Sequence, residues 1–263
     1  MDPRELVEEF LGYPVTKKMG VEAGLRLEER WYASGETDFG IYDSVDFLLH
    51  ILRWQHTAQD SVAHAIDWLR RNRIRVERVL DHGAGLGFTT VALAQAFPDA
   101  RVVGTNLPGL QRSFNDFLLA RAGVQNLEFI PPDEALARRF DVVLCFEVFE
   151  HFKEPAVELD RVLSSKPAVL IDRSSFSLRC PGHFDIYTID GKPSRGRGFQ
   201  EATFAFSRCI RRAGYRYHWT EFYNGRPRIW LRSDVVSLEA TSRAWRRRLG
   251  KYQGDSGPLI VPV

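Results

Sequence analysis

Short apolar runs alternate with amphipathic segments through the middle of the chain, from about residue 76 to residue 175. Apolar runs of this length between turn formers predict buried strands, and apolar residues at helical spacing predict helices. The predicted strands are residues 79–81, 100–105, 126–130, 140–146 and 168–172, and the predicted helices include 88–97 and 155–163. Strands that alternate with helices indicate an α/β domain built on a mostly parallel sheet.

The pattern changes on both sides of this region. Up to about residue 75 the apolar spacing is helical, with Asp43–Ser44 as a helix start, a helix through residues 62–69, and a glycine-punctuated aromatic loop at 31–42. Residues 176–198 are so rich in turn formers that they predict a long loop without regular elements. A helix at 201–213 and strands at 215–223 and 227–232 follow, and the intervening Asn224–Gly225 turn indicates an antiparallel last strand.

These patterns divide the chain into three parts. We expect a helical cap over residues 1–75, a core over 76–235 with an insertion at about 176–198, and a basic C-terminal helix and tail over 236–263. Glycine-containing aromatic loops can close over a pocket, which makes the cap a candidate lid. The simpler interpretation is that its aromatic residues only pack the cap onto the core.

A turn with three glycines follows the first predicted strand. Gly83, Gly85 and Gly87 remove Cβ atoms where the turn needs positive φ and where a ligand would lie against the main chain. The pattern is Gly-x-Gly-x-Gly, with Phe88 where a dinucleotide fingerprint needs glycine, and no Lys-Ser or Lys-Thr pair follows. Thr89 or Thr90 is expected to cap the next helix.

The chain resembles the class I S-adenosylmethionine-dependent methyltransferases of the small-molecule type. The resemblance rests on the acid Asp81 before the glycine turn, on three further strands in the family's order, and on the segment from Glu147 to His151 after the fourth strand. It implies a Rossmann-like, seven-stranded, mostly parallel sheet with an antiparallel last strand, and an N-terminal helical lid. It also implies S-adenosyl-L-methionine as cofactor and S-adenosyl-L-homocysteine as product.

The resemblance also assigns cofactor-binding residues. Gly83, Ala84 and Gly85 are expected to contact the methionine part through main-chain groups, with Asp81 organising the turn. Asn106 stands where the family usually has an acid for both ribose hydroxyls, and an amide offers only one acceptor group. The remaining expected contacts are Leu107 on the adenine, Asp133 on its exocyclic amine, and Phe146 and Glu147 near the methionine end.

Catalysis needs an aligned acceptor and, for a hydroxyl, a base. His151 and His183 are the candidate bases, because an ordinary histidine pKa of about 6.5 lies near neutral pH. The alternative for His151 is a role in packing and in the surroundings of the cofactor. The alternative for His183 is a loop histidine whose hydrogen bonds are made by water. Asp185 and Tyr187 could orient His183, while Tyr32, Tyr42 and Tyr187 are candidate acceptor contacts. Metal binding by His183 and Asp185 is conceivable, but no ligand cluster supports it.

Composition is compatible with an intracellular enzyme. The 263 residues are 44% hydrophobic and carry a formal net charge of +2, so the charge of the whole chain does not indicate nucleic acid or a membrane surface as partner. The odd number of cysteines, three, favours the reducing cytoplasm over a disulfide framework. Neither a secretory leader nor a membrane span is predicted, and a homodimer is left open.

Two other function classes remain as alternatives to a small-molecule O- or N-methyltransferase, such as one of natural-product biosynthesis. Basic segments at 70–73, 195–197 and 243–248 are compatible with an RNA- or DNA-directed enzyme, but the fourth strand ends in Cys145-Phe146-Glu147 and lacks the Pro-containing motifs of those enzymes. Asn106 is the one feature that suggests a non-catalytic member of the fold. Transfer of another group of the cofactor also stays open.

Overall fold

The computed structural model describes residues 2–218 and 227–234. Its centre is a seven-stranded sheet in the order β3-β2-β1-β4-β5-β9-β8. The strands are β1 (Arg78–His82), β2 (Arg101–Thr105), β3 (Leu127–Ile130), β4 (Val142–Phe146), β5 (Val169–Arg173), β8 (Tyr215–His218) and β9 (Arg228–Arg232). β1 to β5 run parallel, while β9 lies antiparallel to both β5 and β8. The expected seven-stranded, mostly parallel sheet is confirmed.

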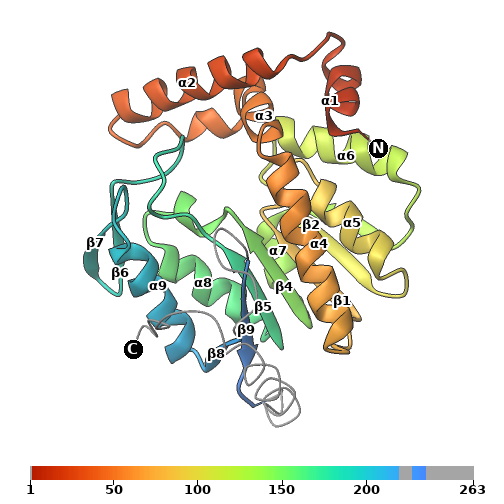
Figure 1. The fold of residues 1–263 in the computed structure, drawn as a ribbon, viewed down its shortest axis with the longest axis vertical. Helices are drawn as coiled ribbons and strands as arrows, with labels where there is room; N and C mark the ends of the chain where they lie inside the picture. The colour runs from red at the N-terminus through yellow and green to blue at the C-terminus, as the bar shows by residue number, and fades with distance from the viewer. Residues whose placement is uncertain (1, 219–226, 235–263) are drawn as a thin grey trace, which may run out of the picture.

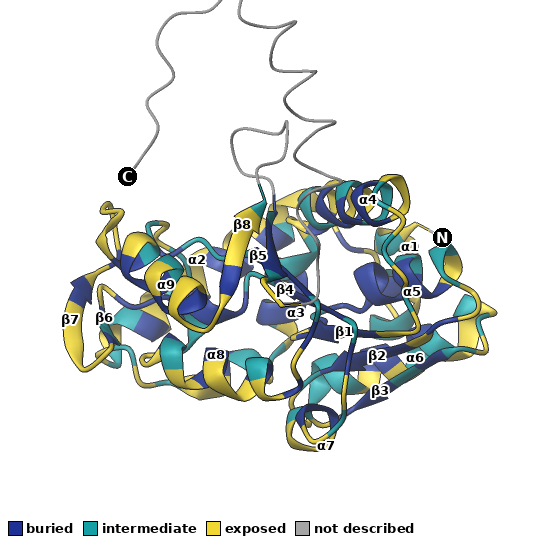
Figure 2. Cartoon of the chain, turned by 90° about the horizontal axis from the view of Figure 1, so that it is seen from below, coloured by how far each residue is buried: buried dark blue, intermediate teal, exposed yellow. Residues whose placement is uncertain are grey.

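Helices cover both faces of this sheet (Figure 1). They are α4 (Gln55–Arg71), α5 (Phe88–Ala96), α6 (Leu110–Ala122), α7 (Pro132–Leu136), α8 (Pro155–Ser164) and α9 (Glu201–Arg212). Successive strand residues point to opposite faces. Val79 joins the cluster that holds buried residues of α4, α5 and α6, and Leu80 joins the cluster that holds those of α7, α8 and α9. The strands are buried from both sides, as Figure 2 shows.

The N-terminal part is helical, as predicted. It consists of α1 (Pro3–Leu11), α2 (Lys17–Ala33), the short 3-10 helix η1 (Phe39–Tyr42) and α3 (Val45–Leu52), with Ser44 as the N-cap of α3. α2 and α3 lie across the carboxyl ends of the parallel strands (Figure 1). Close packing of the two helices requires glycine, because a Cβ on Gly24 would lie 2.6 Å from the Nδ1 atom of His50. The expected aromatic loop is shorter than predicted, since α2 continues to Ala33.

The insertion contains regular structure, so the prediction of a long irregular loop is wrong. Residues Ile186–Ile189 (β6) pair antiparallel with Lys192–Arg195 (β7). The two-residue turn between them, Asp190–Gly191, has φ values of 55° and 69°. Two successive positive φ values are the geometry of the tight hairpin turn that Asp-Gly favours. The signal was present in the sequence, within a segment that its other turn formers made look irregular.

The expected threonine cap of α5 is also wrong. The N-cap is Gly87 in the left-handed region, with φ 83°, and no side chain caps the helix. Thr89 and Thr90 instead donate to a buried carboxylate, described below. The expected Asn224–Gly225 turn and the basic helix over 236–263 lie outside the described residues.

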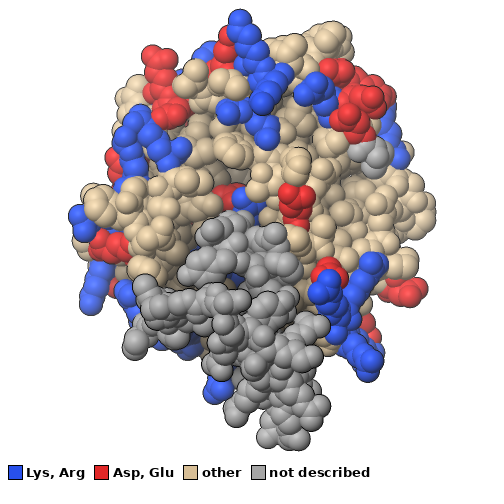
Figure 3. Space-filling view, viewed as in Figure 1, with Lys and Arg blue, Asp and Glu red and all other residues tan. Residues whose placement is uncertain are grey.

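Surface charge, the apolar character of the helices and the state of the cysteines complete the description of the fold. On the face shown in Figure 3, Lys and Arg side chains are interspersed with Asp and Glu around a mostly uncharged centre. Among the helices of residues 2–218 and 227–234, none combines the length and the apolar character that crossing a bilayer requires. All three cysteines are free thiols.

Candidate functional site

The glycine turn lies at the carboxyl end of β1, next to the carboxyl end of β4. The chain builds β1, β2 and β3 outward on one side and then crosses to β4 on the other. In open α/β sheets, ligands bind in the crevice at such a switch point. The turn therefore stands at the position that the fold class reserves for a ligand.

The three glycines of the turn have different reasons to lack a side chain. A Cβ on Gly83 would lie 2.7 Å from Val148, and one on Gly87 would lie 2.8 Å from the ring of Phe129. A Cβ on Gly85 would meet nothing closer than Ile51, at 3.9 Å. Gly83 and Gly87 are thus required by packing. Gly85, with φ 55°, is the glycine of the turn at which packing leaves room for a Cβ, so its main chain is the one that a ligand could approach.

Asp81 is buried directly beneath the turn. One of its carboxylate oxygens accepts hydrogen bonds from the hydroxyls of Thr89 (2.7 Å) and Thr90 (2.6 Å) in the first turn of α5. Burial raises the pKa of Asp81, and the two hydroxyls oppose that shift. Asp81 thereby connects the helix behind the turn to the strand in front of it.

Asn106 at the end of β2 is held by a second amide. Its Nδ2 group donates to the carbonyl of Gly85 (2.7 Å) and to Oδ1 of Asn115 (2.8 Å), and Asn115 also donates to the Gly85 carbonyl (3.0 Å). Both hydrogens of the Asn106 amide are therefore used, and its oxygen remains the group that can accept from a ribose. Asn115 was not among the predicted site residues, although a polar residue between the apolar positions Phe114 and Leu118 was a visible signal.

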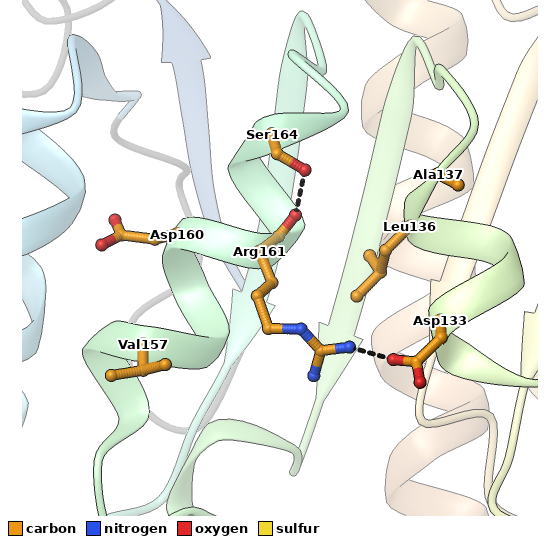
Figure 4. Close-up of a pocket in the computed structure, with 7 residues that line it drawn as sticks. All are labelled: Asp133, Leu136, Ala137, Val157, Asp160, Arg161 and Ser164. Carbon is orange, nitrogen blue, oxygen red and sulfur yellow. Dashed lines mark hydrogen bonds and ion pairs between the residues drawn. The ribbon is translucent and has the colours of Figure 1, made fainter.

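The two residues expected around the adenine lie at the surface. Leu107 is 62% exposed. The Asp133 side chain is 89% exposed and pairs with Arg161 of α8. Asp133 and Arg161 line a shallow groove between α7 and α8 with Leu136, Val157 and others, and Leu107 is not part of it (Figure 4). None of the residues that line this groove belongs to the glycine turn. Because the Asp133 carboxylate is paired with Arg161, it must leave that partner before it can reach an adenine.

The end of β4 carries an acidic pair. Glu147 adopts a positive φ of 54°, accepts from the Ser175 hydroxyl (3.1 Å) and pairs with Arg173 (3.2 Å). Glu150 is fully buried and accepts from the Ser175 main-chain N–H (2.6 Å). Burial, and then the charge and hydrogen bond of Glu147, raise the pKa of Glu150 well above its ordinary value. Phe146, the last residue of β4, is half-buried beside the pair.

Three predicted residues come together beyond β4. The Tyr42 hydroxyl lies 3.0 Å from Nδ1 of His151 and 3.5 Å from the Gly182 carbonyl. The rings of His151 and His183 meet edge to face, with centroids 4.9 Å apart. Burial lowers the pKa of His183 to about 4 and lowers that of His151 well below 6.5. Both imidazoles are therefore neutral at pH 7, the state a base requires.

His50 of α3 borders the same cluster, although the sequence indicated an ordinary helix residue. Its Nε2 atom lies 3.4 Å from the Cys180 thiol. Burial lowers the pKa of His50 to about 4 and raises that of Cys180 to about 12. The thiol is therefore protonated at neutral pH and is no nucleophile.

The trio predicted around His183 does not form, and that prediction is wrong. Nδ1 of His183 pairs with the Leu178 carbonyl (3.1 Å), and Asp185 forms an ion pair with Arg197 (3.6 Å). The fully buried Tyr187 donates to the main-chain carbonyl of Glu150 (3.1 Å). The hydroxyl also accepts from the Phe184 main-chain N–H (3.2 Å), so the buried Tyr187 is part of the core and does not face an acceptor.

Tyr32 lies against two arginines of the insertion. The guanidinium groups of Arg179 and Arg197 lie 4.6 and 5.8 Å from the centre of its ring. Burial raises the pKa of Tyr32 to about 12. Its neighbour Trp31 donates to the main-chain carbonyl of His183 (2.7 Å). These contacts attach α2 to the insertion.

The cap is hydrogen-bonded to both sides of the crevice. On the β2 side, Asp43 accepts from the Leu110 N–H (2.7 Å), and Gln111 donates to the Tyr42 carbonyl (3.1 Å). On the β4 side, the Tyr42 hydroxyl pairs with His151. η1 therefore bridges the two halves of the sheet above their carboxyl ends. In the described part of the chain, no group of His, Cys, Asp and Glu side chains is arranged to hold a metal ion.

Comparisons with known proteins agree with this architecture. The sequence profile of a family described as a methyltransferase domain matches residues 54–180. A solved structure from Nostoc punctiforme, provisionally described as an O-methyltransferase, is 18% identical over 86% of this chain and 72% of its own, with a TM-score of 0.52. An O-methyltransferase family protein from Burkholderia thailandensis is 15% identical over 77% of this chain and 63% of its own, with a TM-score of 0.50. A comparison with curated protein sequences gives no match.

At these identities the structural likeness establishes the fold, and the function has to be argued from the family profile and the site. The profile spans the glycine turn, the strands from β1 to β5 and the segment that contains Glu147 and His151. The sequence resemblance, the profile and the fold therefore agree. Residues 54–180 of this chain therefore match a methyltransferase domain, and the described residues have the Rossmann-like fold of the S-adenosylmethionine-dependent methyltransferases.

Proposed function

We propose that this enzyme transfers the methyl group of S-adenosylmethionine to an oxygen or nitrogen of a small molecule, bound between the end of β4 and the helical cap. The observation that carries the proposal is the contact of Tyr42, from the cap, with His151, at 3.0 Å. It places a neutral imidazole on the β4 side of the crevice whose β1 side is the glycine turn. The cap that supplies Tyr42 acts as a lid over the acceptor.

The cofactor lies along the glycine turn in this proposal. The main chain from Gly83 to Gly85 contacts its methionine part, and the Asn106 side-chain oxygen accepts from one ribose hydroxyl. Leu107 and Asp133 bound the adenine, while Phe146 and Glu147 border the methionine end. When bound, the cofactor would supply a positively charged sulfonium, whose methyl carbon the acceptor would attack in line, with S-adenosylhomocysteine as the leaving group.

His151 takes the acceptor's proton in this proposal. The Nδ1–H group donates to Tyr42, whose own proton points to the Gly182 carbonyl, and Nε2 is left as the base. The acceptor heteroatom gains the methyl group and gives its proton to Nε2. The products are the methylated acceptor, S-adenosylhomocysteine and an imidazolium that solvent deprotonates. Tyr42 fixes the ring and is thus a positioning residue.

A small-molecule acceptor is supported over a nucleic acid by two features. η1 is hydrogen-bonded to α6 over the carboxyl ends of the strands, and a cap at this place restricts the access of a large polymer to them. Basic and acidic side chains are mixed on the face shown in Figure 3, whereas nucleic-acid binding favours a continuous basic surface.

The proposal is tested by calorimetry and by a transfer assay. The wild-type chain is titrated with S-adenosylhomocysteine and then incubated with methyl-labelled S-adenosylmethionine and a panel of phenols, carboxylic acids and amines. We expect 1:1 binding and label transfer to one of these classes. The variant His151→Asn should bind the cofactor like the wild type and lose about 10²- to 10⁴-fold in kcat, the usual contribution of a general base. Absence of binding, or an unchanged kcat in the variant, would sink the proposal.

A further inference from the structure

A buried hydrogen-bond chain runs from the glycine turn through the sheet to helix α8. The Gly83 N–H donates to the Thr105 hydroxyl (3.0 Å), which lies 3.1 Å from Nδ1 of His82. Nε2 of His82 lies 2.8 Å from the carboxylate of Glu158, which also accepts from Arg161 (2.6 Å). His82 and Glu158 are each 3% exposed, so the middle of the chain is shielded from water.

The protons of this chain can be assigned from its ends. An amide N–H only donates, so the Thr105 oxygen accepts from Gly83, and the hydroxyl proton is free to point at Nδ1 of His82. The imidazole then carries its proton on Nε2 and donates it to Glu158. Burial alone would raise the pKa of Glu158, but its hydrogen bonds and charge contacts with His82 and Arg161 hold that pKa below its ordinary value. The chain thus ends on an ionised anchor.

The hydrogen-bond chain ends at the part of the glycine turn along which the cofactor is proposed to lie. Thr105 holds the first two residues of the turn, because its main-chain oxygen also accepts from the Ala84 N–H (2.8 Å). His82 points to the α8 face of the sheet, whereas the preceding Asp81 points to α5. Only the Asp81 side of this arrangement follows from the family resemblance. The second attachment of the turn, on the α8 side, depends on His82, which stands between Asp81 and Gly83.

We propose that Thr105, His82 and Glu158 are positioning residues for the cofactor: they fix the direction of the main-chain groups at Gly83 and Ala84 without touching the ligand. This inference rests on the proposed placement of the cofactor along the glycine turn. If Thr105 loses its hydroxyl, Gly83 loses its partner and His82 loses the group that orients its ring. If Glu158 loses its oxygens, the buried Nε2–H is left without an acceptor.

The test measures the Kd for S-adenosylhomocysteine by calorimetry and the thermal midpoint for two matched pairs of variants. Thr105→Val should raise the Kd about tenfold, the factor that one lost hydrogen bond produces, and Thr105→Ser should restore it. Glu158→Leu should raise the Kd similarly, and Glu158→Gln, which keeps an acceptor for His82, should stay near the wild type. Val162→Ala, at a fully buried position of α8 outside the chain, is the stability control.

The outcomes distinguish the proposed function from the positioning role of the buried chain. Wild-type protein that binds no S-adenosylhomocysteine refutes the proposed function. Wild-type binding with unchanged Kd in Thr105→Val and Glu158→Leu overturns the positioning role alone. The positioning role is also overturned if Val162→Ala raises the Kd as much as Thr105→Val and Glu158→Leu do, at the same loss of thermal midpoint. The effect on the Kd would then come from general destabilisation. If Thr105→Val does not fold, the comparison of Glu158→Leu with Glu158→Gln still gives the answer.

Discussion

Gly85 is the residue at which cofactor binding and protein stability can be separated most cleanly. Its φ of 55° is left-handed, and a Cβ added there would have no neighbour closer than 3.9 Å. Gly123, at the C-terminal end of α6, has a similar φ of 64° and nothing within 4 Å of a built Cβ. Gly85→Ala and Gly123→Ala therefore impose the same backbone cost, one at the proposed cofactor site and one away from it.

The magnitudes follow from these environments. An alanine in the left-handed region costs roughly 1–2 kcal/mol, which lowers the thermal midpoint by about 2–4 °C per kcal/mol in a chain of this size. We expect that loss in both variants. At Gly85 the methyl group also occupies the space where the cofactor contacts the main chain. Loss of two main-chain hydrogen bonds, at about 1–1.5 kcal/mol each, corresponds to an increase in Kd of about a hundredfold.

The assay is calorimetric titration with S-adenosylhomocysteine, together with thermal unfolding of the wild type and both variants. Gly85→Ala should lose affinity and Gly123→Ala should keep it, at similar thermal midpoints. Equal affinities in the two variants would refute the placement of the cofactor along this turn. A large loss of stability confined to Gly85→Ala would refute the claim that the space above it is open.

Three further predictions concern the neighbouring groups. Asn106→Asp, which restores the family's usual acid, should weaken S-adenosylhomocysteine binding by about 1–3 kcal/mol, because a carboxylate cannot donate to the turn carbonyl or to Asn115; tighter binding in calorimetry would contradict this. His183 has a pKa near 4 when folded and about 6.5 when unfolded, so the unfolded chain binds the extra proton and stability falls as the pH drops from about 6.5 towards 4. His183 contributes about 2 kcal/mol to that loss at pH 5. In urea unfolding, His183→Gln should therefore lose correspondingly less stability than the wild type between pH 7 and pH 5. An identical pH dependence in the two proteins would refute the lowered pKa of His183. Tyr42→Phe should lower kcat about tenfold through the freed ring of His151 while leaving cofactor affinity unchanged, and a change in affinity alone would exclude the positioning role.

The fold and the position of the cofactor site could be predicted because they depend on local patterns. Apolar runs and the helices between them determine a parallel sheet, and the glycine spacing after Asp81 marks the turn. The hairpin in the insertion was also encoded locally, in Asp190–Gly191 with apolar residues before it. It was missed because surrounding glycines and prolines outweighed a two-residue signal.

The side-chain partners could not be predicted, since they depend on contacts between distant segments. Tyr187 was expected at an acceptor and instead donates to a carbonyl 37 residues earlier in the chain. Asp133 faces Arg161, 28 residues later, and Tyr42 meets His151 across 109 residues. No periodicity carries such information, because pairing across the fold depends on how the elements pack. The type of residue indicated which chemistry was available, and only the packed structure shows which groups meet.

The order of residues before the glycine turn has a consequence that the glycine pattern alone does not show. Neighbouring strand residues face opposite sides, so Asp81 reaches the first turn of α5, and His82 reaches Glu158 of α8. The turn is therefore held from both helical layers. A polar group on the α8 side is costly unless all its hydrogen bonds are made, and here Thr105 and Glu158 complete them. A substitution that breaks this second attachment should leave Asp81 and α5 in place, and should therefore reduce cofactor affinity before it unfolds the sheet.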